Sequence, residues 1–176
     1  MFSDTLIRWI ENARDAVTQN ILRAVTTPLF DRQSSRTLSS AGLVIKAGAS
    51  ALAKTGASAT KYFANGVYGN IAAATDMAAL SGTVAADDFN VFCFFVDSAG
   101  NLTSAMGTAG ATRGVVKFPQ FPQGKALIGF IEINPTGTGD FVGGTTALDD
   151  ATVVPNAFYV NAVSGFDPAC IIGGVA

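Results

Sequence analysis

The chain has 176 residues, of which only 14% are charged, and its formal net charge is −2. This length supports one domain that buries about 70% of its unfolded surface, so no metal or disulfide is needed to hold it together. The small negative charge argues against nucleic acid as the main partner. No apolar run approaches the roughly 20 residues of a membrane-spanning helix, which argues against a membrane partner.

Residues 1–30 predict an amphipathic α-helix, because apolar side chains recur at spacings of four and three, as in a coiled-coil seam. The helix is expected to end near Pro28, since the residue before proline disfavours the α conformation. So narrow a seam requires a partner helix or a groove in another protein, and the alternative is that the helix folds back on its own domain. A buried Asn20 would set the register of the pairing. The predicted assembly interface comprises Leu6, Ile10, Ala13, Val17, Asn20, Ile21 and Ala24.

Residues 31–40 are polar and rich in serine, which predicts a linker. From residue 41 to 176, short β-type runs alternate with turn signals, a pattern that favours a β-sandwich or barrel. Asn65-Gly66 predicts a hairpin with a type I′ turn, and Gly100 suits a left-handed position in the turn at 97–101. Residues 75–80 are expected to form one helical turn. The predicted strands are Leu43–Ala47, Ala51–Lys54, Thr60–Ala64, Val67–Ala72, Phe89–Val96, Leu102–Met106, Ala126–Ile133 and Ala157–Val163.

The run Val91–Val96 is apolar at every position instead of alternating with polar residues. Both of its faces therefore require burial. It is either a central strand covered on both sides, which we favour, or a strand whose outer face meets another subunit. Cys93 within this run is expected to be a small buried hydrophobe with a free thiol.

The residue types of common catalytic sites are missing. The chain has no histidine, the usual general base and the commonest metal ligand. The pairs Asp87-Asp88 and Asp149-Asp150 could contribute to a weak calcium site, but neighbouring aspartates are more often turn formers. A glycan-cleaving enzyme needs a carboxylate pair, and nothing in the sequence selects one. We therefore expect no enzyme, no catalytic residue, no bound metal and no cofactor.

Aromatic side chains are the other candidates for a binding face. A carbohydrate- or protein-binding surface could use them, whereas packing in the core is their more common role. Three flank the Asn-Gly hairpin and five lie in stretches that contain proline or glycine. They are Tyr62, Phe63, Tyr68, Phe118, Phe121, Phe158, Tyr159 and Phe166.

Residues 41–150, taken together, resemble a known class of proteins. The resemblance rests on Gly42–Lys46, on the hairpin Tyr62–Ile71 and on Phe92–Leu102. Its most distinctive part is Gly124–Ile133 followed by Phe141–Asp149. On these segments the chain resembles the small virion structural proteins of tailed bacteriophages, of the head decoration, cement or head-fibre type. The N-terminal helix departs from this pattern, because many β-sandwich decoration proteins lack one.

The resemblance implies a jelly-roll-like β-sandwich that clusters as a trimer on the outside of a capsid. It implies that the chain is made in the host cytoplasm and cements the shell by binding the major capsid protein and by self-association. The alternative is a head- or tail-fibre module that binds a receptor. We therefore expect a mainly β protein with an N-terminal helix at 1–30, a linker at 31–40 and a β-sandwich at 41–176.

Overall fold

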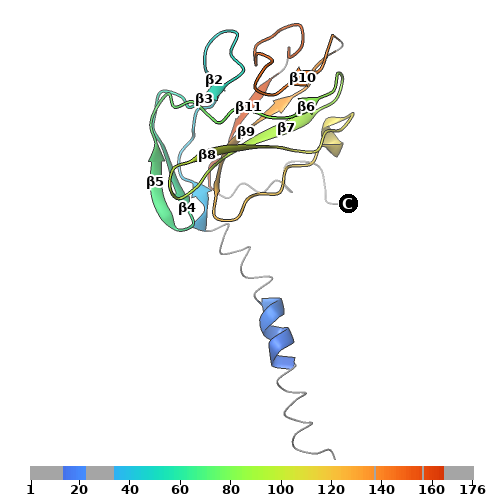
Figure 1. Ribbon diagram of the computed structural model, residues 1–176. Helices are drawn as coiled ribbons and strands as arrows, with labels where there is room; N and C mark the ends of the chain where they lie inside the picture. Colours follow the sequence, from blue (N-terminus) through green and yellow to red (C-terminus); the bar gives the residue numbers. More distant parts are fainter. Residues whose placement is uncertain (1–13, 23–33, 137, 156, 165–176) are drawn as a thin grey trace, which may run out of the picture. The chain divides into compact units, whose positions relative to one another are not determined.

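The computed structural model describes residues 14–22, 34–136, 138–155 and 157–164 (Figure 1). The chain divides into two compact units, Met1–Gln33 and Ser34–Ala176. In the first unit, residues 14–22 are helical and exposed. The described part of the second unit is mainly β, with one short 3₁₀ turn, η1, at Arg113–Val115. These features confirm a mainly β protein with a helical N-terminal segment. No helix within the described residues is long and apolar enough to cross a membrane.

The largest sheet has four antiparallel strands in the order β11-β9-β7-β8 (Figure 1). Strand β7 is central, because it pairs with β8 on one side and with β9 on the other. A long loop joins β8 to β9. The pairing of β7 with β9 shifts register between Phe94 and Phe95, which marks a β-bulge. The strands are β7 at Asn90–Val96, β8 at Leu102–Met106, β9 at Ala126–Ile133 and β11 at Phe158–Asn161.

Three smaller antiparallel sheets complete the described β unit. One has the order β1-β4-β5, and the other two are the pairs β2-β3 and β10-β6. The strands are β1 at Arg36–Thr37, β2 at Val44–Ile45, β3 at Ala53–Lys54, β4 at Thr60–Ala64, β5 at Val67–Ile71, β6 at Thr83–Val84 and β10 at Phe141–Val142.

Strand β7 is buried on both faces, because its alternate side chains enter two different apolar clusters. Phe92 and Phe94 lie in the larger cluster together with Tyr62 from β4. Cys93 and Phe95 lie in a second cluster on the opposite side. The prediction of a central strand covered on both sides is therefore confirmed, and so is the burial of the free thiol of Cys93.

Both predicted turns have the expected backbone. Asn65 and Gly66 have φ values of 50° and 75°, as a type I′ turn requires, and Gly100 has a φ of 86°. The helical turn predicted at Thr75–Leu80 is wrong, because none of these residues is helical. Asp76 forms a β-bridge with Lys54, and the backbone N–H of the next residue, Met77, donates to the carbonyl of Ala53 at 2.8 Å. Pairing with β3 satisfies the backbone groups that a helix would otherwise have paired internally.

Strand β1 lies inside the segment that was predicted to be a linker. Its residues pair with Phe63 and Tyr62 of β4. Thr37 is buried, and its hydroxyl donates to the carbonyl oxygen of Leu127 in β9. The end of the serine-rich segment is therefore part of the β unit.

Candidate functional site

The predicted assembly interface is described for three of its seven residues. Val17, Asn20 and Ile21 lie on the exposed helical segment 14–22. Val17 and Ile21, 57% and 59% exposed, are one turn apart and therefore share a face. This apolar stripe is open to solvent in the described chain. The other four predicted residues, Leu6, Ile10, Ala13 and Ala24, lie outside the described residues.

The second face of the main sheet is covered by the chain's own loop between β8 and β9. Val116 is buried there, and Phe118 and Phe121 pack against the second cluster. The ring of Phe121 lies edge-on to Phe95 at 5.4 Å between centroids, and that of Phe118 lies edge-on to Phe130 at 5.0 Å. Two of the candidate binding aromatics are therefore packing residues, and this face needs no other subunit to bury it.

The remaining aromatics divide between the core, the surface and the loops. Tyr62 is buried, whereas Tyr68 is exposed on the edge strand β5 and contacts Phe63 edge-on at 5.7 Å. Phe158 is 52% exposed, and the guanidinium of Arg113 lies 5.6 Å from its ring centroid. Phe166 lies outside the described residues.

The acidic pair at 149–150 is occupied by loop hydrogen bonds. The carboxylate of Asp149 accepts the N–H of Ala49 at 3.0 and 3.1 Å, which ties this loop to the β2-β3 hairpin. Asp150 accepts the N–H groups of Thr152 and Val153 at 2.9 and 3.3 Å. Within the described residues, no three His, Cys, Asp or Glu side chains gather where they could hold a metal. Turn formation therefore accounts for Asp150, while Asp149 also borders a hollow.

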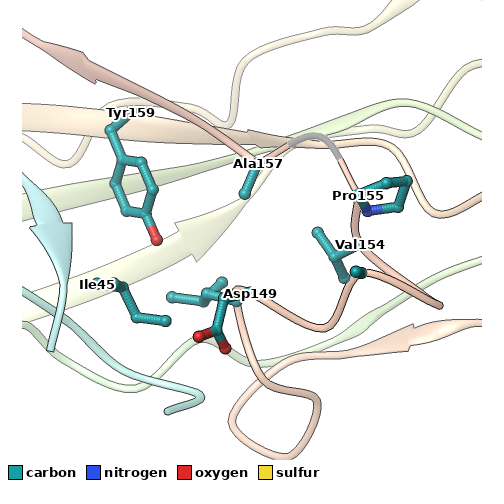
Figure 2. A pocket seen from close by; sticks show the side chains of 8 residues that line it. Ile45, Asp149, Val154, Pro155, Ala157 and Tyr159 are labelled. Carbon is teal, nitrogen blue, oxygen red and sulfur yellow. The ribbon is translucent and has the colours of Figure 1, made fainter. Parts of the chain in front are cut away.

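That hollow lies where the β2 strand, the loop between β10 and β11, and the start of β11 meet, and its volume is about 270 Å³ (Figure 2). Backbone pairing holds these distant segments together, since the N–H of Leu148 donates to the carbonyl of Ser50 at 2.9 Å. Most of its wall is aliphatic, and its polar groups are a phenol and a carboxylate. It is lined by Ile45, Leu148, Asp149, Ala151, Val154, Pro155, Ala157 and Tyr159.

Tyr159 carries the most unusual polar group of this hollow. Its hydroxyl points into the space between Ile45 and Asp149 (Figure 2). The oxygen is buried and has no hydrogen-bond partner within the described residues. Burial raises the pKa of Tyr159 to about 12, and the negative charge of Asp149 adds to the effect. The phenol therefore stays protonated at neutral pH and can both donate and accept a hydrogen bond.

The sequence identified two members of this hollow, Tyr159 as a candidate aromatic and Asp149 as part of an acidic pair. It did not indicate that they would meet. Ile45 is more than 100 positions away from both, and no motif marks Val154 or Pro155. The signal that could have found them is the alternation along β11, which turns Tyr159 inward and leaves Phe158 exposed.

Comparisons with known proteins add no assignment, because no family model, curated protein or solved structure matches this chain.

Proposed function

We propose that this chain is a non-enzymatic virion structural protein that decorates and cements a bacteriophage capsid. The observation that carries the proposal is the exposed apolar stripe of Val17 and Ile21 on the helical segment. The β unit covers both faces of its main sheet with its own residues. It can therefore form a stable body, while the N-terminal segment binds the capsid or a second copy of the chain.

The energetics favour a partner for the helical segment. Burying one Val, Leu or Ile side chain stabilises a complex by roughly 1.5–3 kcal/mol. Short helices are marginal in water on their own, so docking also stabilises the helix itself. A second copy of this segment, or a groove on the major capsid protein, would supply the missing contacts for the stripe.

The capsid exterior is proposed because of the resemblance of residues 41–150 to decoration and cement proteins. With it we propose a jelly-roll-like β-sandwich, self-association as a trimer, and binding to the major capsid protein. The second candidate, a head- or tail-fibre module that binds a receptor, is favoured by one observation, the open hollow around Tyr159.

Substitution within the full-length chain tests the attachment role. Ile21→Asp places a charge in the apolar stripe, and we expect a smaller mass by light scattering or loss of binding to particles. A charge brought into an apolar contact costs several kcal/mol. Gln19→Asp is the matched control, because it adds the same charge on the opposite side of the same exposed segment. Self-association and particle binding that survive Ile21→Asp would contradict the proposal.

Counting copies in purified particles separates the two candidates. A decoration protein should occur in numbers comparable to the major capsid protein, measured by quantitative mass spectrometry of the virion. A fibre module should occur in a few copies at one vertex or on the tail. Absence of the chain from purified particles would refute both.

A further inference from the structure

We infer that the hollow around Tyr159 binds a primary alkylammonium group, such as the end of a lysine side chain or of a free alkyl amine. The hollow combines a buried polar group, a negative charge and an aliphatic wall (Figure 2). Nothing in this inference depends on the capsid role proposed above.

The polar groups of the hollow require a partner that donates hydrogen bonds and carries positive charge. A buried hydroxyl without a partner is costly, so a ligand that satisfies Tyr159 is stabilised there. No ion pair of Asp149 is seen within the described residues. The nearest lysine along the β2 strand, Lys46, is paired with Asp76 at 2.5 Å. An ammonium group has three N–H donors, which can serve Asp149 and water, and a small rotation of the Tyr159 ring would bring its buried oxygen within reach of the third.

The rest of the hollow fits an alkyl chain. Ile45, Leu148, Val154, Pro155 and Ala157 present carbon surface, against which methylene groups lose contact with water. The volume of about 270 Å³ lies just below the range of roughly 300–1,000 Å³ that is typical of small-molecule pockets. It is therefore suited to a single extended side chain and too small for an oligosaccharide.

An NMR titration of the full-length ¹⁵N-labelled protein, followed by its amide chemical shifts, tests whether the hollow binds an ammonium group. The probe is n-pentylammonium chloride, and the matched controls are 1-pentanol, which has the same shape without the charge, and methyl glucoside. We expect the ammonium probe to shift amides of residues 148–154 and 157–160, and to bind at least about fivefold more tightly than pentanol. Equal binding of pentanol, or tighter binding of the sugar, would overturn the inference.

A second probe distinguishes the two sources of the group. Nα-acetyl-lysine N-methylamide carries the same ammonium on a blocked amino acid. Binding at least as tight as that of pentylammonium assigns the site to lysine side chains of a polypeptide. Binding of pentylammonium alone assigns it to free amines. Failure of both probes would refute the ammonium site and leave the attachment role of the helical segment untouched.

Variants of the lining residues locate the binding. Asp149→Asn removes the charge but keeps an oxygen for the N–H of Ala49, and we expect binding to weaken about fivefold or more. Tyr159→Phe removes the hydroxyl and keeps the ring, and a smaller loss is expected. Ala151→Trp should block the hollow from its exposed rim, whereas Ala111→Trp, on an exposed loop outside its lining, should change nothing. Binding that is unchanged in all three lining variants would contradict the site.

Discussion

Residues 14–22 and strand β7 use apolar side chains in opposite ways. In the helical segment every residue is exposed, including Val17, Ile21 and Leu22. In β7 all seven residues are buried, and its alternate side chains enter two different clusters. Six of the seven residues of β7 are apolar, whereas residues 14–22 carry four apolar residues among nine, so the two segments differ both in composition and in what their apolar side chains meet within the described chain.

This difference shows that an apolar stretch is not by itself evidence of a core. Strand β7 lies between two partner strands, and the loop that carries Phe118 and Phe121 covers its second face. With a partner strand on each side and a covering layer on each face, all seven residues of β7 are buried. In the helical segment, Val17 and Ile21 are more than half exposed within the described chain, and apolar side chains that are exposed together on one face are typical of a binding surface.

The largest expected effect comes from truncating the centre of β7. Phe92→Ala should lower the free energy of unfolding by about 3–5 kcal/mol, because Phe92 is fully buried and contacts Phe141 edge-on. Urea unfolding followed by far-UV circular dichroism measures this loss. Ile21→Ala is the control and should change the stability by less than about 0.5 kcal/mol. Similar losses in both variants would break the comparison, since the helical segment would then belong to a folded core.

An intermediate effect is expected at Cys93, which faces the second cluster of β7. Cys93→Ser should cost about 1–3 kcal/mol, because it places a hydroxyl among apolar side chains. Burial also raises the pKa of the Cys93 thiol, so almost no reactive thiolate forms at neutral pH. In a Cys170→Ser background, a bulky thiol reagent should label Cys93 only after denaturation. Rapid labelling of the native protein would show that this face of β7 is open.

The smallest effect is expected at Asp97, in the exposed turn that ends β7. Hydrogen bonds from the side chain and backbone of Asn101 lower the pKa of Asp97, helped by the N–H of Ala99 and the charge of Lys125. A lowered pKa in the folded state means that the ionised form stabilises the fold, and this stability is lost as the pH falls.

Asp97→Asn should therefore lower the melting temperature slightly at pH 7. The difference from the unsubstituted protein should shrink as the pH falls below 3.8, the ordinary pKa of the group. Thermal melts between neutral and acidic pH measure it. A difference in melting temperature that grew on acidification would contradict the claim that the ionised form of Asp97 stabilises the fold.

Sequence reasoning predicted the strands with strong local signals. The bounds of β4, β8 and β9 match the predicted ranges, and the Asn65-Gly66 turn defines the β4-β5 hairpin. Their own residues supply the alternation, the apolar runs and the turn chemistry that determine these elements. Such features are readable without knowledge of the rest of the fold.

The elements that were missed are short and depend on distant partners. Strands β1, β6 and β10 have two residues each, and β6 and β10 pair across more than 50 positions. No periodicity exists in two residues, so their pairing is decided by tertiary contacts. The candidate site was missed for the same reason, since Ile45 and Tyr159 come together only when the β2 strand, β11 and a loop assemble.

The contact between the start of the β unit and the β4-β5 hairpin has a consequence for chemical ageing. An asparagine followed by glycine is prone to deamidation, in which the glycine nitrogen attacks the asparagine side-chain amide. Here the N–H of Gly66 donates to the carbonyl of Ser34 at 2.8 Å, and that of Asn65 donates to the hydroxyl of Ser35 at 3.0 Å. The attacking nitrogen of Gly66 is thus held in a hydrogen bond, and we expect deamidation of Asn65 to be slower in the folded protein than in the unfolded chain.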